Sequence, residues 1–106
     1  MRPVFFVYIL SSLSGTLYVG MTDDLPLRIS QHRNGRYDSF TKRYKVNRLM
    51  YCEVLNDCHA ASAREKQIKR YSRAKKIALF AKTNSHWKDM STDLYPLGRG
   101  RAAASR

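Results

Sequence analysis

Two tyrosines, one in each arm of a predicted β-hairpin, are the first side chains along the chain that could do chemistry. Tyr8 and Tyr18 lie in two apolar, β-prone runs that are separated by a short segment rich in Ser and Gly. If the turn centres near Leu13, the two side chains lie opposite each other on one face. Most such pairs are ordinary cross-strand packing, and the alternative is that two phenols converge on one small site. Gly20 favours that alternative, because a missing side chain lets a ligand approach the backbone.

A predicted helix over residues 22–35 carries an arginine and a histidine along one edge of its apolar stripe. Leu25 and Ile29 form the stripe, and Arg28 and His32 are spaced four residues apart beside it. Either residue alone would ordinarily be a solvated surface group. As a pair beside the sheet, the arginine offers a bidentate donor for a phosphate, and the histidine can move a proton near neutral pH.

A glutamate lies on the apolar face of a second predicted helix. Glu65 shares that face with Ala61 and Ile68, so its carboxylate must either be paired or hold a metal ion. A salt bridge is one reading, because three basic residues are close in sequence: Arg64, Lys66 and Lys69. The other is a hard cation such as Mg²⁺, which takes oxygen ligands and often needs only one or two carboxylates. No second acid is evident in the predicted core, so such a site would have a single protein ligand.

These side chains together include the groups that hydrolysis of a phosphodiester requires, namely an arginine, an acid for a metal, and a tyrosine or histidine for proton transfer. The 20 Lys and Arg residues against 8 Asp and Glu give a net charge of +12, which favours nucleic acid as a partner. A basic protein that is merely soluble, or one that touches anionic lipid, is the alternative. Residues 36–45 interleave basic and aromatic side chains that could hold phosphates and stack on bases. The candidate nucleic-acid contacts are Gly20, Lys42, Arg43, Lys66, Lys69 and Arg70.

The order of predicted elements is β-β-α-β-α-α, which indicates an α+β domain with a small antiparallel sheet. We expect residues 1–95 to form one domain and the small, basic, turn-rich segment 96–106 to be a flexible tail. The last helix should turn Ile77, Phe80 and Ala81 toward the core. Strands are expected at 4–10, 16–21 and 46–54, helices at 22–35, 56–73 and 74–82, and a loop at 36–45.

Several classes of protein fit the sequence poorly. Two cysteines, Cys52 and Cys58, are too few for a disulfide framework or a four-ligand zinc site, so we expect reduced thiols, with a single disulfide left open. No apolar run approaches the ~20 residues of a membrane span. The run at 4–10 is short for a signal peptide and lacks a following cleavage motif, which leaves secretion as a minor alternative. The expected location is the cytoplasm, with no membrane and no evident protein partner.

In this order and spacing, the segments resemble the GIY-YIG endonuclease superfamily, and in particular its small single-domain, YhbQ-like bacterial branch. The resemblance covers roughly residues 4–90. The two name-giving motifs correspond to Val7–Ile9 and Tyr18–Gly20, and the signature that carries the arginine and histidine corresponds to residues 20–32. The other two signatures of the branch resemble residues 40–54 and 63–76.

The resemblance implies a three-stranded antiparallel sheet flanked by helices, a single divalent ion (Mg²⁺ or Mn²⁺), and cleavage of DNA, with RNA left open. By position, Tyr8 or Tyr18 would help to deprotonate the attacking water, and the choice between them stays open. Arg28 would stabilise the phosphate, His32 would assist proton transfer, and Glu65 would bind the metal. An unperturbed phenol has a pKa near ~10, so a tyrosine base needs help from its neighbours or from the metal.

The sequence also departs from the family pattern. Val7 stands near the leading glycine of the first motif, which affects the local backbone more than the chemistry. Asn84 is the candidate for a late asparagine that the family often adds near the site, with its register left open. The branch carries no further DNA-recognition domain, so the natural substrate is open. The expected function is a metal-dependent DNA endonuclease in repair, recombination or nucleic-acid processing; the alternative is a non-catalytic nucleic-acid-binding module on a nuclease-like scaffold.

Overall fold

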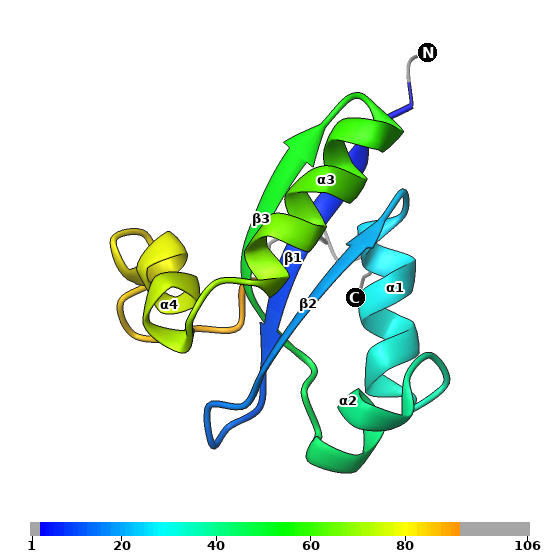
Figure 1. Cartoon of the computed structure of the whole chain (residues 1–106). Coiled ribbons are helices and arrows are strands. Elements are labelled where there is room, and N and C mark those ends of the chain that lie inside the picture. The colour runs from blue at the N-terminus through cyan, green and yellow to red at the C-terminus, as the bar shows by residue number, and fades with distance from the viewer. Residues whose placement is uncertain (1–2, 92–106) are drawn as a thin grey trace.

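The computed structural model describes residues 3–91, so the tail expected at 96–106 lies outside the described residues. The fold is built on three antiparallel strands in the order β2-β1-β3 (Figure 1). This arrangement confirms the predicted α+β class and its small antiparallel sheet. The strands are β1 (Phe5–Ser11), β2 (Leu17–Thr22) and β3 (Arg48–Leu55).

Within residues 3–91, four helices accompany the sheet, and each follows a residue whose side chain accepts a hydrogen bond from a backbone N–H of the first turn. Along residues 3–91, none of the helices has the length and apolar content that a membrane span requires. The helices are α1 (Leu25–Arg33), α2 (Ser39–Tyr44), α3 (Cys58–Lys69) and α4 (Arg73–Ala81), and their N-caps are Asp24, Asp38, Asp57 and Ser72.

The helix α2 replaces the loop that the sequence predicted for residues 36–45. Asp38 Oδ1 accepts hydrogen bonds from the backbone N–H groups of Phe40 at 2.8 Å and of Thr41 at 3.2 Å. Lys45, in the left-handed region at φ 54°, ends the helix. Six residues are too few to reveal a helical hydrophobic period, so the cap is the only local signal for this element.

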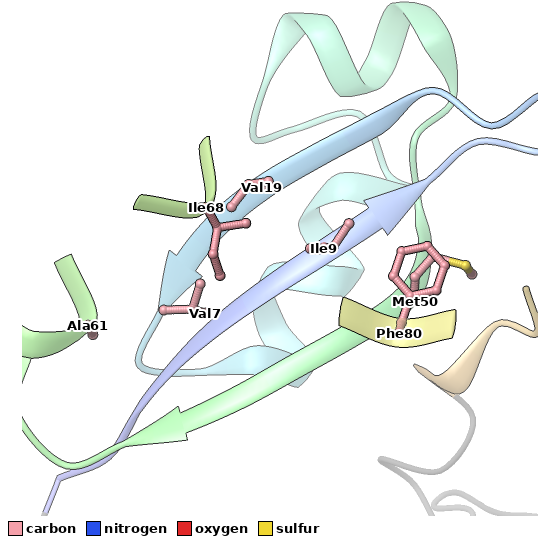
Figure 2. Packing of buried hydrophobic residues seen from close by; sticks show 7 residues of the cluster. All are labelled: Val7, Ile9, Val19, Met50, Ala61, Ile68 and Phe80. Carbon is pink, nitrogen blue, oxygen red and sulfur yellow. The ribbon is translucent and has the colours of Figure 1, made fainter. Parts of the chain in front are cut away.

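One face of the sheet carries the aliphatic part of the core. Val7 and Ile9 of the central strand are fully buried against Ile68 of α3 and Phe80 of α4, as Figure 2 shows. Alternate residues of a strand point to opposite faces, so these two positions fix which face α3 and α4 cover. The prediction for Phe80 is confirmed, whereas Ala81 is exposed because it occupies the last position of α4.

The opposite face carries the second part of the core, which includes Tyr8. Tyr8 and Leu10, which alternate with the residues just described, are fully buried and pack against Leu25 and Ile29 of α1. The predicted apolar stripe of α1 is therefore the surface by which this helix contacts the sheet. α1 and α3 thus lie on opposite faces, with the edge strand β2 between them (Figure 1).

Candidate active site

The two tyrosines share one face of the hairpin but lie on a diagonal, which corrects the prediction that they lie directly opposite each other. In the β1–β2 register, Tyr8 pairs with Gly20 and Tyr18 pairs with Leu10. The hairpin turns about Ser14, one residue later than predicted, and a shift of one residue in the centre moves the pairing by two. The rings still meet, with centroids 6.4 Å apart.

The missing side chain of Gly20 makes room for a phenol of the protein itself. A Cβ atom at this position would overlap the hydroxyl oxygen of Tyr8, and it would lie 2.5 Å from Tyr8 Cζ and 3.0 Å from Tyr18 Cε2. The sequence suggested that this space admits a ligand, but the Tyr8 ring fills it. Gly20 therefore shapes the site from within.

His32 lies inside the molecule, 2% exposed, rather than at the edge of the stripe. Its Nε2 is 3.1 Å from the Tyr8 hydroxyl, and its Nδ1 is 2.9 Å from the Thr41 hydroxyl. Burial, reinforced by the positive charge of Arg28, lowers the pKa of His32 to about 4, although Asp38 opposes the shift. The imidazole is therefore neutral at pH 7 and a weak base there, able to act as a hydrogen-bond acceptor through one ring nitrogen and as a donor through the other.

The Arg28 guanidinium lies beside the phenols. It donates to the Met21 carbonyl oxygen over 3.2 Å, and its Cζ lies 4.0 Å from the centre of the Tyr37 ring. Burial raises the pKa of Tyr8, and the neighbouring Tyr18 raises it further, whereas Arg28 lowers it. Burial is the largest of these effects, so Tyr8 stays protonated at neutral pH.

Tyr18 is the more accessible phenol, because it is half-buried whereas Tyr8 is fully buried. Its hydroxyl lies 3.5 Å from Asp38 Oδ2, a long distance for a hydrogen bond between oxygens. Burial raises the pKa of Tyr18, and the negative charges of Asp38 and Glu65 raise it further, while Arg28 lowers it. Glu65 is therefore close enough for its charge to act on the hydroxyl that solvent can approach.

Glu65 comes from the helix on the other face of the sheet. α3 packs against β1 and the edge strand β2, and β2 carries Tyr18. Its side chain is 20% exposed and pairs with Lys69 over 3.1 Å. Glu65 therefore has the salt bridge that the sequence allowed for. Lys69 is 53% exposed, however, and ion pairs with a solvent-exposed partner are weak. Arg64 instead pairs with Glu53 on β3, at 2.7 Å.

The residues near Glu65 fit only a sparse metal site. In the part of the chain described, no group of three or more His, Cys, Asp and Glu side chains could hold an ion. An ion at Glu65 would therefore have at most two such side chains as ligands among the described residues. Mg²⁺ and Mn²⁺ accept such a site, because hard cations take oxygen ligands and Mg²⁺ keeps several waters and binds substrate phosphates. A structural zinc site does not fit, because it needs four protein ligands.

Two of the candidate nucleic-acid contacts are exposed on α2, beside the phenols. Lys42 and Arg43 point to solvent there, and the same helix exposes the aromatic rings of Phe40 and Tyr44. The Phe40 ring stacks on that of Tyr18 with centroids 6.5 Å apart. The basic and aromatic surface of α2 therefore continues directly into the candidate site.

The other candidates lie farther along the chain. Lys66 and Arg70 are exposed and line a hollow on the outer side of α3, while Lys69 is the partner of Glu65. Asn84 is buried, and its amide closes a loop by donating to the Lys88 carbonyl and accepting from the Lys88 N–H, both at 2.8 Å. The structure does not bring Asn84 into contact with the phenols.

Three residues of the cluster were not predicted from the sequence. Tyr37 contacts both Arg28 and His32, and Asp38 and Thr41 hold the polar groups of the cluster from the first turn of α2. All three fall in the segment that was predicted to be a loop. Asp is a residue type favoured at helix N-caps, and a helix that begins after Asp38 would have placed Thr41 in its first turn.

Replacing Gly20 with alanine tests the close approach of the Tyr8 phenol. We expect Gly20→Ala to lower the free energy of unfolding by about 1–3 kcal/mol, the usual cost of overpacking, as measured by urea denaturation. In a Tyr8→Ala background, the same change should cost much less, because the overlapping ring is absent. Equal costs in the two backgrounds would contradict the assignment.

The burial of His32 predicts a specific pH dependence of stability. With a folded-state pKa of about 4 and an unfolded value near 6.5, the unfolded state binds more protons between these two values. The contribution of neutral His32 is therefore complete above pH 6.5 and falls as the pH drops toward 4, by about 3 kcal/mol in all. Denaturation curves at pH 7 and 4 should show this loss in the wild type and in His59→Gln, a control at an exposed histidine, but not in His32→Gln.

Comparison with known proteins identifies the fold family. The family model described as "GIY-YIG catalytic domain" matches residues 4–78. A UPF0213 protein of Staphylococcus saprophyticus is 36% identical over 76 residues, covering 72% of this chain and 93% of the relative. A UPF0213 protein of Syntrophus aciditrophicus is 36% identical over 75 residues, covering 70% of this chain and 86% of the relative.

A solved structure agrees with the fold. The solution NMR structure of the UPF0213 protein BH0048 from Bacillus halodurans superposes with a TM-score of 0.52 and 28% sequence identity, covering 82% of this chain and 93% of that one. The resemblance first drawn from the motifs is thereby confirmed. The chain belongs to the GIY-YIG family, a nuclease superfamily, and to its UPF0213, YhbQ-like members.

Proposed function

We propose that this protein is a divalent-metal-dependent endonuclease that hydrolyses phosphodiester bonds in DNA. The observation that carries the proposal is the meeting of two kinds of group at Tyr18. One kind, from α1 and β1, is the cluster of Arg28, His32 and Tyr8. The other is the carboxylate of Glu65 on α3, the helix that packs against the strand carrying Tyr18, and its negative charge raises the pKa of Tyr18. A purely structural cluster does not need an acid from the opposite face.

Each side chain has a role that follows from its surroundings. Arg28 is the cation that faces the phenols, and it would hold a phosphate oxygen and stabilise the charge that develops there. Glu65 would hold the divalent ion, which when bound supplies positive charge that lowers the pKa of water and polarises a phosphoryl oxygen. The carboxylate would exchange its exposed partner Lys69 for that stronger charge.

Of the two phenols, we assign Tyr18 to the attacking water, because Tyr8 is fully buried. The Tyr18 hydroxyl is oriented toward Asp38, which leaves an oxygen lone pair to accept a hydrogen bond from water. The raised pKa of Tyr18 keeps the phenol protonated, so it orients the water and can receive a proton only while passing its own to Asp38. Tyr8 and His32 form the buried floor that holds this arrangement.

Removing the carboxylate of Glu65 tests the proposal. Glu65→Gln should reduce Mg²⁺- or Mn²⁺-dependent cleavage by about 100-fold or more, the size of effect seen when one electrostatic group is lost from an active site. Binding of a labelled oligonucleotide in EDTA should be no weaker, because a negative charge has been removed. The assay should compare single-stranded, duplex, flap and junction DNA with matched RNA.

Glu53→Gln is the matched control, because Glu53 is a paired carboxylate on β3 that takes no part in the proposed site. It should cleave like the wild type at a temperature at which circular dichroism shows both variants folded. Cleavage by Glu65→Gln at the wild-type rate would reject the assignment. A wild-type protein that retains DNA but nicks nothing with any divalent ion would instead favour the non-catalytic binding module.

The exposed basic residues of α2 predict a measurable salt dependence of binding. Each Lys or Arg that contacts a phosphate adds roughly one unit to the slope of log K against log salt, so Lys42→Ala with Arg43→Ala should lower that slope by about two. The control pair Lys75→Ala with Lys82→Ala removes the same charge from α4 and its C-cap, on the other face of the sheet, and should leave the slope unchanged. Fluorescence anisotropy at several salt concentrations measures both, and equal slopes in the two double variants would contradict the role of α2.

A further inference from the structure

Three hydrogen bonds in series connect the first turn of α2 to the buried tyrosine. Thr41 Oγ1 donates to the backbone carbonyl oxygen of Asp38 over 3.1 Å. The same oxygen lies 2.9 Å from His32 Nδ1, and His32 Nε2 lies 3.1 Å from the Tyr8 hydroxyl. Thr41, His32 and Tyr8 are each at most 2% exposed, so water does not replace these contacts.

The directions of these bonds follow from the number of hydrogens available. A threonine hydroxyl has one hydrogen, and Thr41 gives it to the Asp38 carbonyl oxygen, which can only accept. Thr41 must therefore accept from His32, so Nδ1 carries the hydrogen of the neutral ring. Nε2 is left with its lone pair, and the Tyr8 hydroxyl must donate to it.

This direction determines what Tyr8 offers to the rest of the site. With its hydrogen directed at His32, the Tyr8 oxygen keeps its lone pairs for a donor such as the Arg28 guanidinium, which donates to the carbonyl of Met21, next to Gly20, the cross-strand partner of Tyr8. In the opposite tautomer, His32 would donate to Tyr8, and the hydroxyl hydrogen of Tyr8 would turn toward a cation. The correct tautomer therefore favours the position of Arg28 beside the phenols.

We propose that Thr41 is a positioning residue that fixes His32 as the Nδ1–H tautomer, so that Tyr8 donates to His32 and presents its oxygen to Arg28. The last link of this chain, the effect on cleavage, rests on the proposed function. The tautomer itself does not, because it is a property of the free protein.

The tautomer is measured by long-range ¹H–¹⁵N NMR spectra of histidine-labelled protein at pH 7. In the wild type and in Thr41→Ser, which keeps the hydroxyl, the spectra should show a protonated Nδ1 and an unprotonated Nε2 for His32. In Thr41→Val, which keeps the shape but loses the acceptor, the Nε2–H form should gain population; Thr41→Ala serves if the valine variant does not fold. An Nε2–H ring in the wild type, or an unchanged ring in the valine variant, overturns the proposal.

Cleavage kinetics test the final link. Thr41→Val should lower kcat by roughly 10- to 100-fold, as loss of a supporting hydrogen bond behind a functional group commonly does, with little change in KM, and Thr41→Ser should restore it. A role in folding alone predicts lower stability with normal kcat and an unchanged tautomer. Equal loss of kcat in the serine and valine variants also overturns the proposal. If neither the wild type nor the variants cleave DNA but the His32 tautomer responds as expected, the proposed function fails while the role of Thr41 in fixing the tautomer stands.

Discussion

The register of the β1–β2 hairpin is the constraint on which the site depends. It places Tyr8 opposite Gly20, the position at which an added Cβ would overlap the phenol, and Tyr18 two residues away on the same face. A slip of one residue in the pairing of β2 with β1 would turn Tyr18 toward α3 and the aliphatic core while Tyr8 kept its face, because strand side chains alternate between faces. The hairpin therefore selects which helix the tyrosines meet, and α1 supplies Arg28 and His32 to that face.

The proposed site combines residues from both faces of the sheet. The phenols and the groups of α1 belong to one face, and Glu65 belongs to the helix on the other. Because β2 is an edge strand, the acid can act on Tyr18 without crossing the sheet. Burial keeps the phenols protonated and His32 neutral, so the cluster has few charges until a phosphate or a cation arrives. Such a site is organised by hydrogen bonds rather than by ion pairs.

Much of the fold could be predicted from the sequence, because long apolar runs and strong caps are local signals. Hydrophobic periodicity and capping residues predicted the three strands and the helices α1, α3 and α4. The motifs identified the family. The parts that failed depend on tertiary contacts or on short elements. The turn centre decides whether Tyr8 faces Gly20, and Asn84 is a loop-closing residue only because Lys88 returns to it. Thr41 could not be predicted because the six-residue helix α2 is too short to show a helical hydrophobic period in the sequence.

We propose that Glu65 and Tyr18, which come from opposite faces of the sheet, lie next to the same bound cation. Paramagnetic broadening by Mn²⁺ in amide NMR spectra of the free protein tests this most directly, because the effect falls steeply with distance from the ion. The signals of Glu65 and of Tyr18 should broaden together at the lowest Mn²⁺ concentrations. Broadening that centres on Glu53 or Asp57 and leaves Glu65 and Tyr18 sharp would contradict it.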